Sequence, residues 1–171
     1  STSSLSDRFS TSLAIDGDYA VVGNSYQGGG GNYIPPIPAV YVFKRDNAEW
    51  NQQAILNPEA KNGFGTEIGS VDIDGDMIVV GADNGFGSIY TYKRNGTDWN
   101  QSAKVEASDA STGLRLGYSV SISGDYIIAG TQNKGAYVFS TTTPTFASVA
   151  LAADNSTIAV TLSEAVYSTS G

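Results

Sequence analysis

The amino-acid sequence contains an internal repeat, and this repeat limits the possible folds more than any other feature. Each copy consists of an alternating stretch, a short turn that contains Gly, and an apolar run that ends in Gly. A second, aromatic pattern follows, and Tyr90 lies as far from Tyr41 as Trp99 lies from Trp50. The copies of the first pattern are residues 9–23, 68–81 and 116–130, and those of the second are 39–45, 88–94 and 136–139. So many matched positions predict a protein built from repeated structural units.

Each unit is predicted to hold short antiparallel strands. Leu13 and Ile15 occupy alternate positions, as in a half-buried strand. A two-residue turn with Gly, which tolerates positive φ, joins that strand to an apolar run that we expect to be buried on both faces. The turns are Asp16-Gly17, Asp74-Gly75 and Ser123-Gly124, and the apolar runs are 19–22, 77–80 and 126–129. A third strand is expected at 41–43, 89–92 and 136–139, and a fourth at 50–56 and 99–105.

Four strands in a repeated unit of about 40–50 residues are typical of a β-propeller blade. We therefore expect an all-β fold of propeller-type repeats within residues 1–140, with units at about 5–57, 63–107 and 114–140. The third unit lacks its last strand. Because propellers close with about 4–8 blades, these three repeats predict an incomplete propeller that belongs to a larger one or associates with other chains. A linker at 141–145 and a C-terminal β-hairpin within 146–171 are expected to follow.

The repeat resembles the FG-GAP repeat, which builds the seven-bladed propeller of integrin α-subunits and of many bacterial surface proteins. Residues 116–125, Leu-Gly-Tyr-Ser-Val-Ser-Ile-Ser-Gly-Asp, match its pattern best, and Phe9-Ser10 and Phe64-Gly65 match more loosely. The resemblance covers roughly residues 5–140 and implies a role in adhesion or recognition outside the cell. Residues 146–167 resemble the opening strands of bacterial Ig-like domains.

FG-GAP repeats often carry a calcium-binding aspartate loop, and this sequence departs from that loop. Its Asp-Gly-Asp turns are too short to supply the about 6–8 oxygen ligands that Ca²⁺ takes. Asp72, Asp74 and Asp76 form the densest acidic group and are the candidate calcium ligands. The alternative is that these residues only shape a hairpin turn, where Asp is favoured. No other cofactor is expected.

The long insertion at residues 24–38, which holds four consecutive Gly residues, interrupts the repeat. Long propeller insertions lie on one rim, where ligands bind, so Tyr26, Tyr33 and Ile34 are candidate residues of a binding or assembly loop. A surface loop without a binding role is the alternative. The aromatic residues at equivalent repeat positions are expected to pack between blades, and Trp50 and Trp99 could alternatively stack on sugars.

The composition excludes several classes of catalytic and binding function. The sequence has no His and no Cys, which excludes Cys nucleophiles, Ser-His-Asp triads and ordinary zinc sites. A net charge of −8 argues against nucleic acid as the main partner. No apolar run reaches the roughly 18 residues of a membrane span.

We therefore expect a non-enzymatic scaffold at the cell surface or outside the cell that binds a protein or glycan ligand. One alternative is a structural subunit that self-associates into a ring or filament by pairing its exposed β-edges. A second alternative is a lectin-like propeller that binds carbohydrate.

Overall fold

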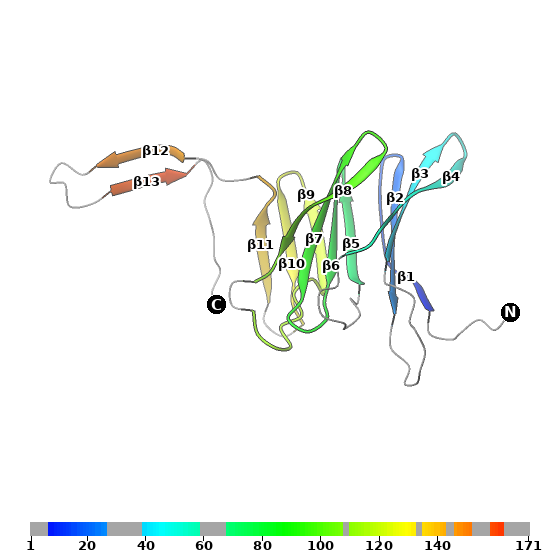
Figure 1. Cartoon of the computed structure of the whole chain (residues 1–171), viewed down its shortest axis with the longest axis horizontal. Coiled ribbons are helices and arrows are strands. Elements are labelled where there is room, and N and C mark those ends of the chain that lie inside the picture. Colours follow the sequence, from blue (N-terminus) through cyan, green and yellow to red (C-terminus); the bar gives the residue numbers. More distant parts are fainter. Residues whose placement is uncertain are drawn as a thin grey trace.

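The computed structural model describes residues 7–26, 39–58, 68–107, 110–132, 135–142, 146–151 and 158–162. In these ranges the regular elements are β-strands, which form antiparallel sheets (Figure 1). No helix long and apolar enough to cross a membrane is found among these residues.

Three of the sheets correspond to the three repeats, and we name them blades 1, 2 and 3. In blades 1 and 2 each strand pairs with the next along the chain, and blade 3 follows the same order with three strands. Blade 1 contains β1 (Asp7–Asp16), β2 (Tyr19–Tyr26), β3 (Ala39–Asp46) and β4 (Glu49–Leu56). Blade 2 contains β5 (Ile68–Asp74), β6 (Met77–Ala82), β7 (Ser88–Asn95) and β8 (Asp98–Val105). Blade 3 contains β9 (Ser119–Ser123), β10 (Tyr126–Gly130) and β11 (Ala136–Ser140).

A separate two-stranded sheet follows blade 3. It pairs β12 (Phe146–Leu151) with β13 (Ile158–Leu162). The predicted fold class is thereby confirmed: propeller-like antiparallel repeats, an incomplete third unit and a C-terminal hairpin. The predicted domain boundaries stay a prediction.

The repeat extends to the register of the strands. The ladder between the last two strands is interrupted at Val42/Phe43 in blade 1 and at Thr91/Tyr92 in blade 2. The hairpin turns agree as well, since Gly17, Gly75 and Gly124 have φ values of 53°, 55° and 54°. This is the left-handed region that Gly enters without the steric cost of a side chain.

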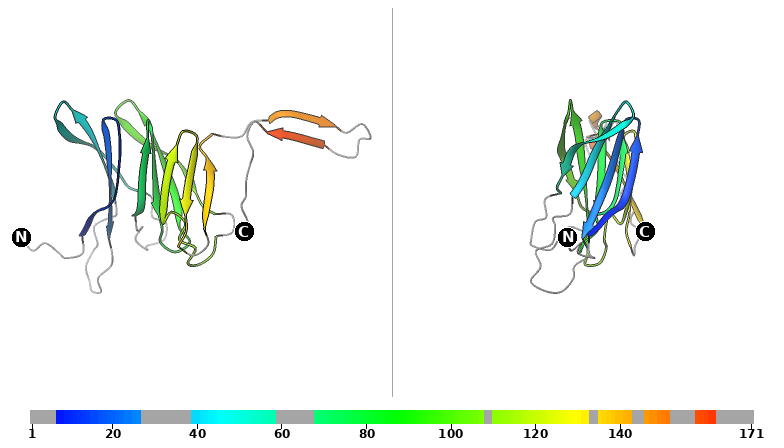
Figure 2. Two further views of the ribbon diagram at one scale, coloured as in Figure 1. Left: turned by 180° about the vertical axis from the view of Figure 1, so that it is seen from behind. Right: turned by 90° about the vertical axis from the view of Figure 1, so that its right-hand side faces the viewer.

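The blades stack face to face in chain order, so that β5 packs on β1 and β2, and β9 packs on β5 and β6 (Figures 1 and 2). Two apolar layers fill the spaces between the blades. The layer between blades 1 and 2 consists of Tyr19, Val21, Val40, Val42, Leu56, Ile68, Val71, Ile73, Ile78, Val80, Ala82, Tyr90, Tyr92 and Trp99. The layer next to blade 3 consists of Val79, Ile89, Ala107, Leu114, Leu116, Ile122, Ile127 and Ala129.

The second strand of each blade was predicted to be buried on both faces, and this holds for β6 but not for β10. In β6 every residue except Met77 is buried. In β10, Ile127 and Ala129 are buried, whereas Tyr126 and Ile128 are exposed. The reason is the place of each blade in the stack, because in the described part of the chain no sheet packs on the far face of blade 3.

Candidate functional site

The first aspartate of the Asp-Gly-Asp turn connects neighbouring blades. Oδ2 of Asp16 accepts a hydrogen bond from the backbone N–H of Gly75 at 2.7 Å. Oδ2 of Asp74 accepts one from the backbone N–H of Gly124 at 2.6 Å. Each bond runs from one turn to the equivalent turn of the next blade. A carboxylate acceptor makes such a bond stronger than one between neutral groups.

The second aspartate of the same turn acts within its own blade. Asp18 accepts hydrogen bonds from Nε and Nη2 of Arg45 at 2.9 and 2.6 Å. Asp76 forms the equivalent ion pair with Arg94. Since both Arg residues lie on the third strand, the second aspartate fixes the turn to that strand.

Further side chains of the first strands also bridge the blades. Oγ of Ser12 accepts from the N–H of Val71, and Oγ of Ser70 accepts from the N–H of Val120, both at 2.9 Å. These residues occupy the same repeat positions in successive blades. We call the contact between two neighbouring blades a seam. The two seams are therefore built on one pattern, in which the earlier blade supplies the side-chain acceptor and the later blade supplies the backbone donor.

The candidate calcium ligands Asp72, Asp74 and Asp76, which we call the aspartate trio, have separate partners. Asp72 adds to the seam, because its Oδ2 accepts from the Oγ of Ser121 and from the N–H of Ile122, both at 2.8 Å. Within the described ranges no group of three or more His, Cys, Asp or Glu side chains could hold a metal ion. Calcium binding by the trio stays a prediction.

Asp83, which follows β6, is a buried carboxylate. Its Oδ2 lies 2.8 Å from Nη2 of Arg115, and its carbonyl oxygen accepts from Nε of the same guanidinium at 3.1 Å. Burial raises the pKa of Asp83, and the charge of Arg115 partly opposes this rise. The pair ties the loop after β6 to the segment that leads into blade 3.

The predicted binding loop falls largely outside the described residues. Tyr33 and Ile34 lie there entirely. For Tyr26 the structure describes the backbone, which pairs with Asp7 at the end of β2. Their role in binding or assembly stays a prediction.

Trp99 and Trp50 occupy equivalent positions but have different surroundings. Trp99 is buried and contacts Tyr19 edge to face, with ring centroids 5.8 Å apart. Its indole N–H donates to Oε1 of Gln53 at 3.2 Å. The guanidinium of Arg94 lies 4.6 Å from the centroid of Tyr19. Trp99 is thus part of the packing between blades, whereas Trp50 is exposed.

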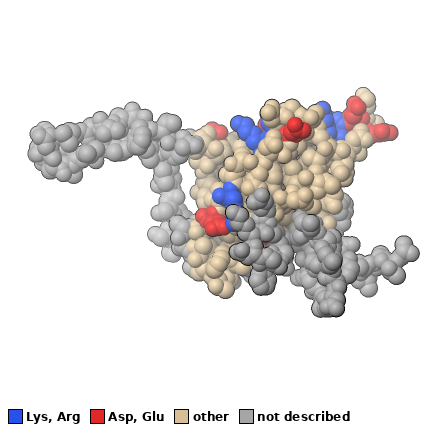
Figure 3. All heavy atoms as spheres, viewed as in Figure 1, with Lys and Arg blue, Asp and Glu red and all other residues tan. Residues whose placement is uncertain are grey.

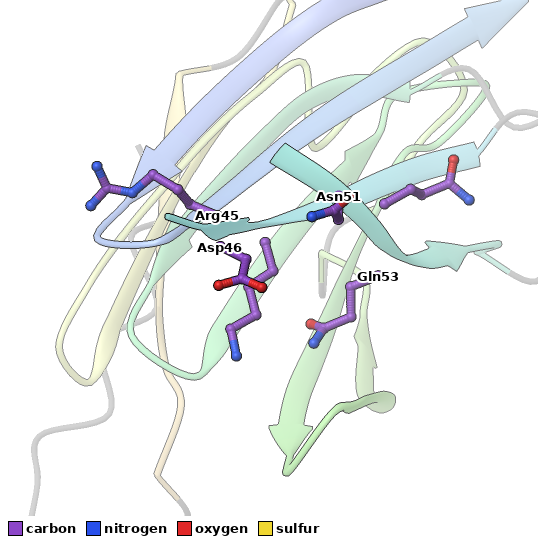
Figure 4. Close-up of a pocket in the computed structure, with 6 residues that line it drawn as sticks. Arg45, Asp46, Asn51 and Gln53 are labelled. Atoms are coloured by element: carbon purple, nitrogen blue, oxygen red, sulfur yellow. The ribbon is translucent and has the colours of Figure 1, made fainter. Parts of the chain in front are cut away.

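A polar pocket of about 380 Å³ lies on the hairpin of β3 and β4 (Figure 4). Asp46 and Gln53 point to one side of this hairpin, and Arg45 points away from them (Figure 4). The lining residues are Lys44, Arg45, Asp46, Asn51, Gln52 and Gln53. Amide, ammonium and carboxylate groups can together donate and accept hydrogen bonds to a polar ligand. Sequence reasoning did not single out this pocket, and its only signal is the run of amide side chains after Trp50.

The charged side chains of the visible face gather mainly along the rim formed by the hairpin turns (Figure 3). The polar pocket belongs to this rim, since Lys44, Arg45 and Asp46 precede the turn between β3 and β4.

Comparison with known proteins gives one family profile that matches two segments of the chain. The profile described as "FG-GAP repeat" matches residues 3–43 and 99–139. No curated protein matches the chain. Among solved structures, a computationally designed protein, Ika4, aligns at 11% sequence identity and a TM-score of 0.36, over 82% of this chain and 95% of that chain. The two matched segments fall in blade 1 and in the region from β8 to β11. Two segments of the chain are therefore similar to the FG-GAP repeat, and its three larger sheets are arranged like the blades of an incomplete propeller.

Proposed function

We propose that this chain is a non-catalytic scaffold for adhesion or recognition. We propose further that it acts outside the cell or on a bacterial cell surface. The observation that supports this role best is the polar pocket on blade 1, which lies on a stack whose bridging carboxylates are engaged in holding the blades together. A stack of bridged blades that displays polar groups at its rim is suited to binding a macromolecule.

Two of the residues that line the pocket have partners within the stack. Arg45 is paired with Asp18 of its own blade. Gln53 accepts the indole N–H of Trp99 from the next blade. Side chains that are fixed before binding lose less conformational entropy when a ligand arrives. Asn51 and Gln52 are exposed, so their amide groups are available to peptide groups or sugar hydroxyls.

The experiment that tests this role is a binding screen of the intact chain against arrays of glycans and of extracellular proteins. We expect a reproducible ligand whose binding is weakened by the double variant Asn51→Ala, Gln52→Ala. Blade 2 provides the matched control, because Asn100 and Gln101 occupy the equivalent positions. Blank arrays, or equal loss of binding in the control variant Asn100→Ala, Gln101→Ala, would overturn the proposal.

A further inference from the structure

We infer that the outer face of blade 3 binds the outer face of blade 1 of a second copy of this chain. Copies then join head to tail in the way that blades 1, 2 and 3 join within one chain. This inference goes beyond the proposed recognition role. It rests on repeat equivalence, because exposed residues of both outer faces occupy the repeat positions whose equivalents are buried at the internal seams.

The leading face is the side of blade 1 that points away from blade 2, and it carries exposed apolar residues. Leu13 and Ile15 of this face are 64% and 67% exposed. Their equivalents in blade 2, Val71 and Ile73, are 4% and 5% exposed because they pack on blade 1. The leading face therefore has the same apolar character as a face that another blade covers.

The trailing face is the side of blade 3 that points away from blade 2, and it has the complementary pattern. Tyr126 and Ile128 are 55% and 49% exposed. In blade 1 the equivalent residues, Tyr19 and Val21, are 9% and 0% exposed because blade 2 covers them. Val138, which pairs with Ile128 in the sheet, is also exposed.

The best-defined contact at the seam of blades 1 and 2 gives a specific expectation for the contact between copies. In that seam Trp99 packs edge to face on Tyr19, and Arg94 lies over the same ring. Trp50 has the position of Trp99, and Tyr126 has that of Tyr19. We expect Trp50 of one copy to pack on Tyr126 of the other, with Arg45 in the position of Arg94.

The polar contacts of the seam are only partly available to a second copy. Ser119 has the position of Ser12 and Ser70, and it is exposed. It can accept the N–H of Leu13 from the next copy. At the position of Asp16 and Asp74, however, blade 3 has Ser123. A neutral hydroxyl replaces the carboxylate, so the contact between copies is weaker than the internal seams.

The number of blades favours a closed dimer. A contact between two different faces continues into a ring or a filament. Two copies supply six blades, which lies within the range of about 4–8 that closes a propeller.

The first test is sedimentation equilibrium of the intact 171-residue chain over a wide range of concentration. We expect a species with twice the chain mass of 17.8 kDa. Trp50→Ala and Tyr126→Ala should each weaken the association by at least about tenfold, as loss of an aromatic anchor does at other interfaces. Phe86→Ala is the matched control, because Phe86 is equally exposed and lies on the loop between β6 and β7. The Phe86→Ala variant should associate as strongly as the unmodified chain. A chain that stays monomeric at the highest concentration would overturn the inference.

The second test separates contacts between faces from pairing of strand edges. Ile15→Glu blocks the leading face, and Ile128→Glu blocks the trailing face. Each variant alone should be monomeric. An equimolar mixture should form a heterodimer, because one variant keeps an intact trailing face and the other keeps an intact leading face. If each variant alone still associates like the unmodified chain, the copies meet through β-edges or the C-terminal hairpin, and the inference is wrong.

Discussion

The bridging serines of the blade seams allow a quantitative test, because the chain contains the same residue with and without a following blade. Ser70 accepts the N–H of Val120 at 2.9 Å, and both residues are partly buried. Ser70→Ala removes the acceptor and leaves the N–H without a partner in the seam. An unsatisfied buried donor costs about 1–3 kcal/mol. Because water reaches part of this seam, we expect a loss of about 1–2 kcal/mol in the free energy of unfolding.

The loss should be visible in both stability and local protection. For a chain of this size about 1 kcal/mol shifts the melting temperature by about 2–4 °C, so a fall of about 2–8 °C is expected. The amide of Val120 should also lose protection from hydrogen exchange. Ser12→Ala should behave in the same way through Val71. Ser119→Ala should change stability by less than about 0.5 kcal/mol at a dilution where the chain is monomeric. If Ser119→Ala costs as much as Ser70→Ala, the seam bonds do not carry the stability assigned to them.

Three further predictions follow from the same contacts. Gly81→Ala should destabilise the chain more than Gly23→Ala. A Cβ at Gly81 would lie 2.0 Å from the backbone oxygen of Gly117, whereas the atom nearest to a Cβ at Gly23 is a side-chain methyl of Ile68 at 3.0 Å. Similar melting temperatures of the two variants would contradict this prediction. The raised pKa of Asp83 means that the folded chain binds this proton more tightly than the unfolded chain, so the stability of the unmodified chain relative to Asp83→Asn should rise as the pH falls from the folded pKa towards 3.8. If the difference in the free energy of unfolding between the two chains, measured by urea denaturation, does not change with pH, the raised pKa of Asp83 is refuted. Calcium binding by the aspartate trio should raise the melting temperature saturably against a chelator control, whereas an unchanged melting temperature would support the alternative that these residues only shape the turn.

The strands and turns were predictable because they depend on local sequence. The alternation of Leu13 and Ile15 and the Gly residues of the turns determine where strands begin and end. The position of each blade in the stack is not a local property. For this reason Trp50 and Trp99, which each follow an acidic residue and precede Asn-Gln, could not be told apart from the sequence.

The candidate site was harder to predict, because the partners of its residues come from other blades. Asp74 reads as a turn residue in sequence, and its bond to the N–H of Gly124 depends on how two blades are placed. The sequence pattern indicates only that Gly81 ends an apolar run. The structure adds that this position must lack a side chain because the backbone of Gly117 comes so close. The only sequence signal of the polar pocket is the run of amide side chains after Trp50, and such a run does not by itself indicate a pocket.

The seams also have a consequence for synthesis on the ribosome. At both seams the side chains that accept backbone N–H groups belong to the blade that is made first. An early blade can keep these hydroxyl and carboxylate groups in water at little cost until the next blade is complete. Each new blade then docks onto a template that already presents its acceptors. The stack is therefore suited to growth in one direction, from the N-terminal blade towards the C-terminal one, at the pace of translation.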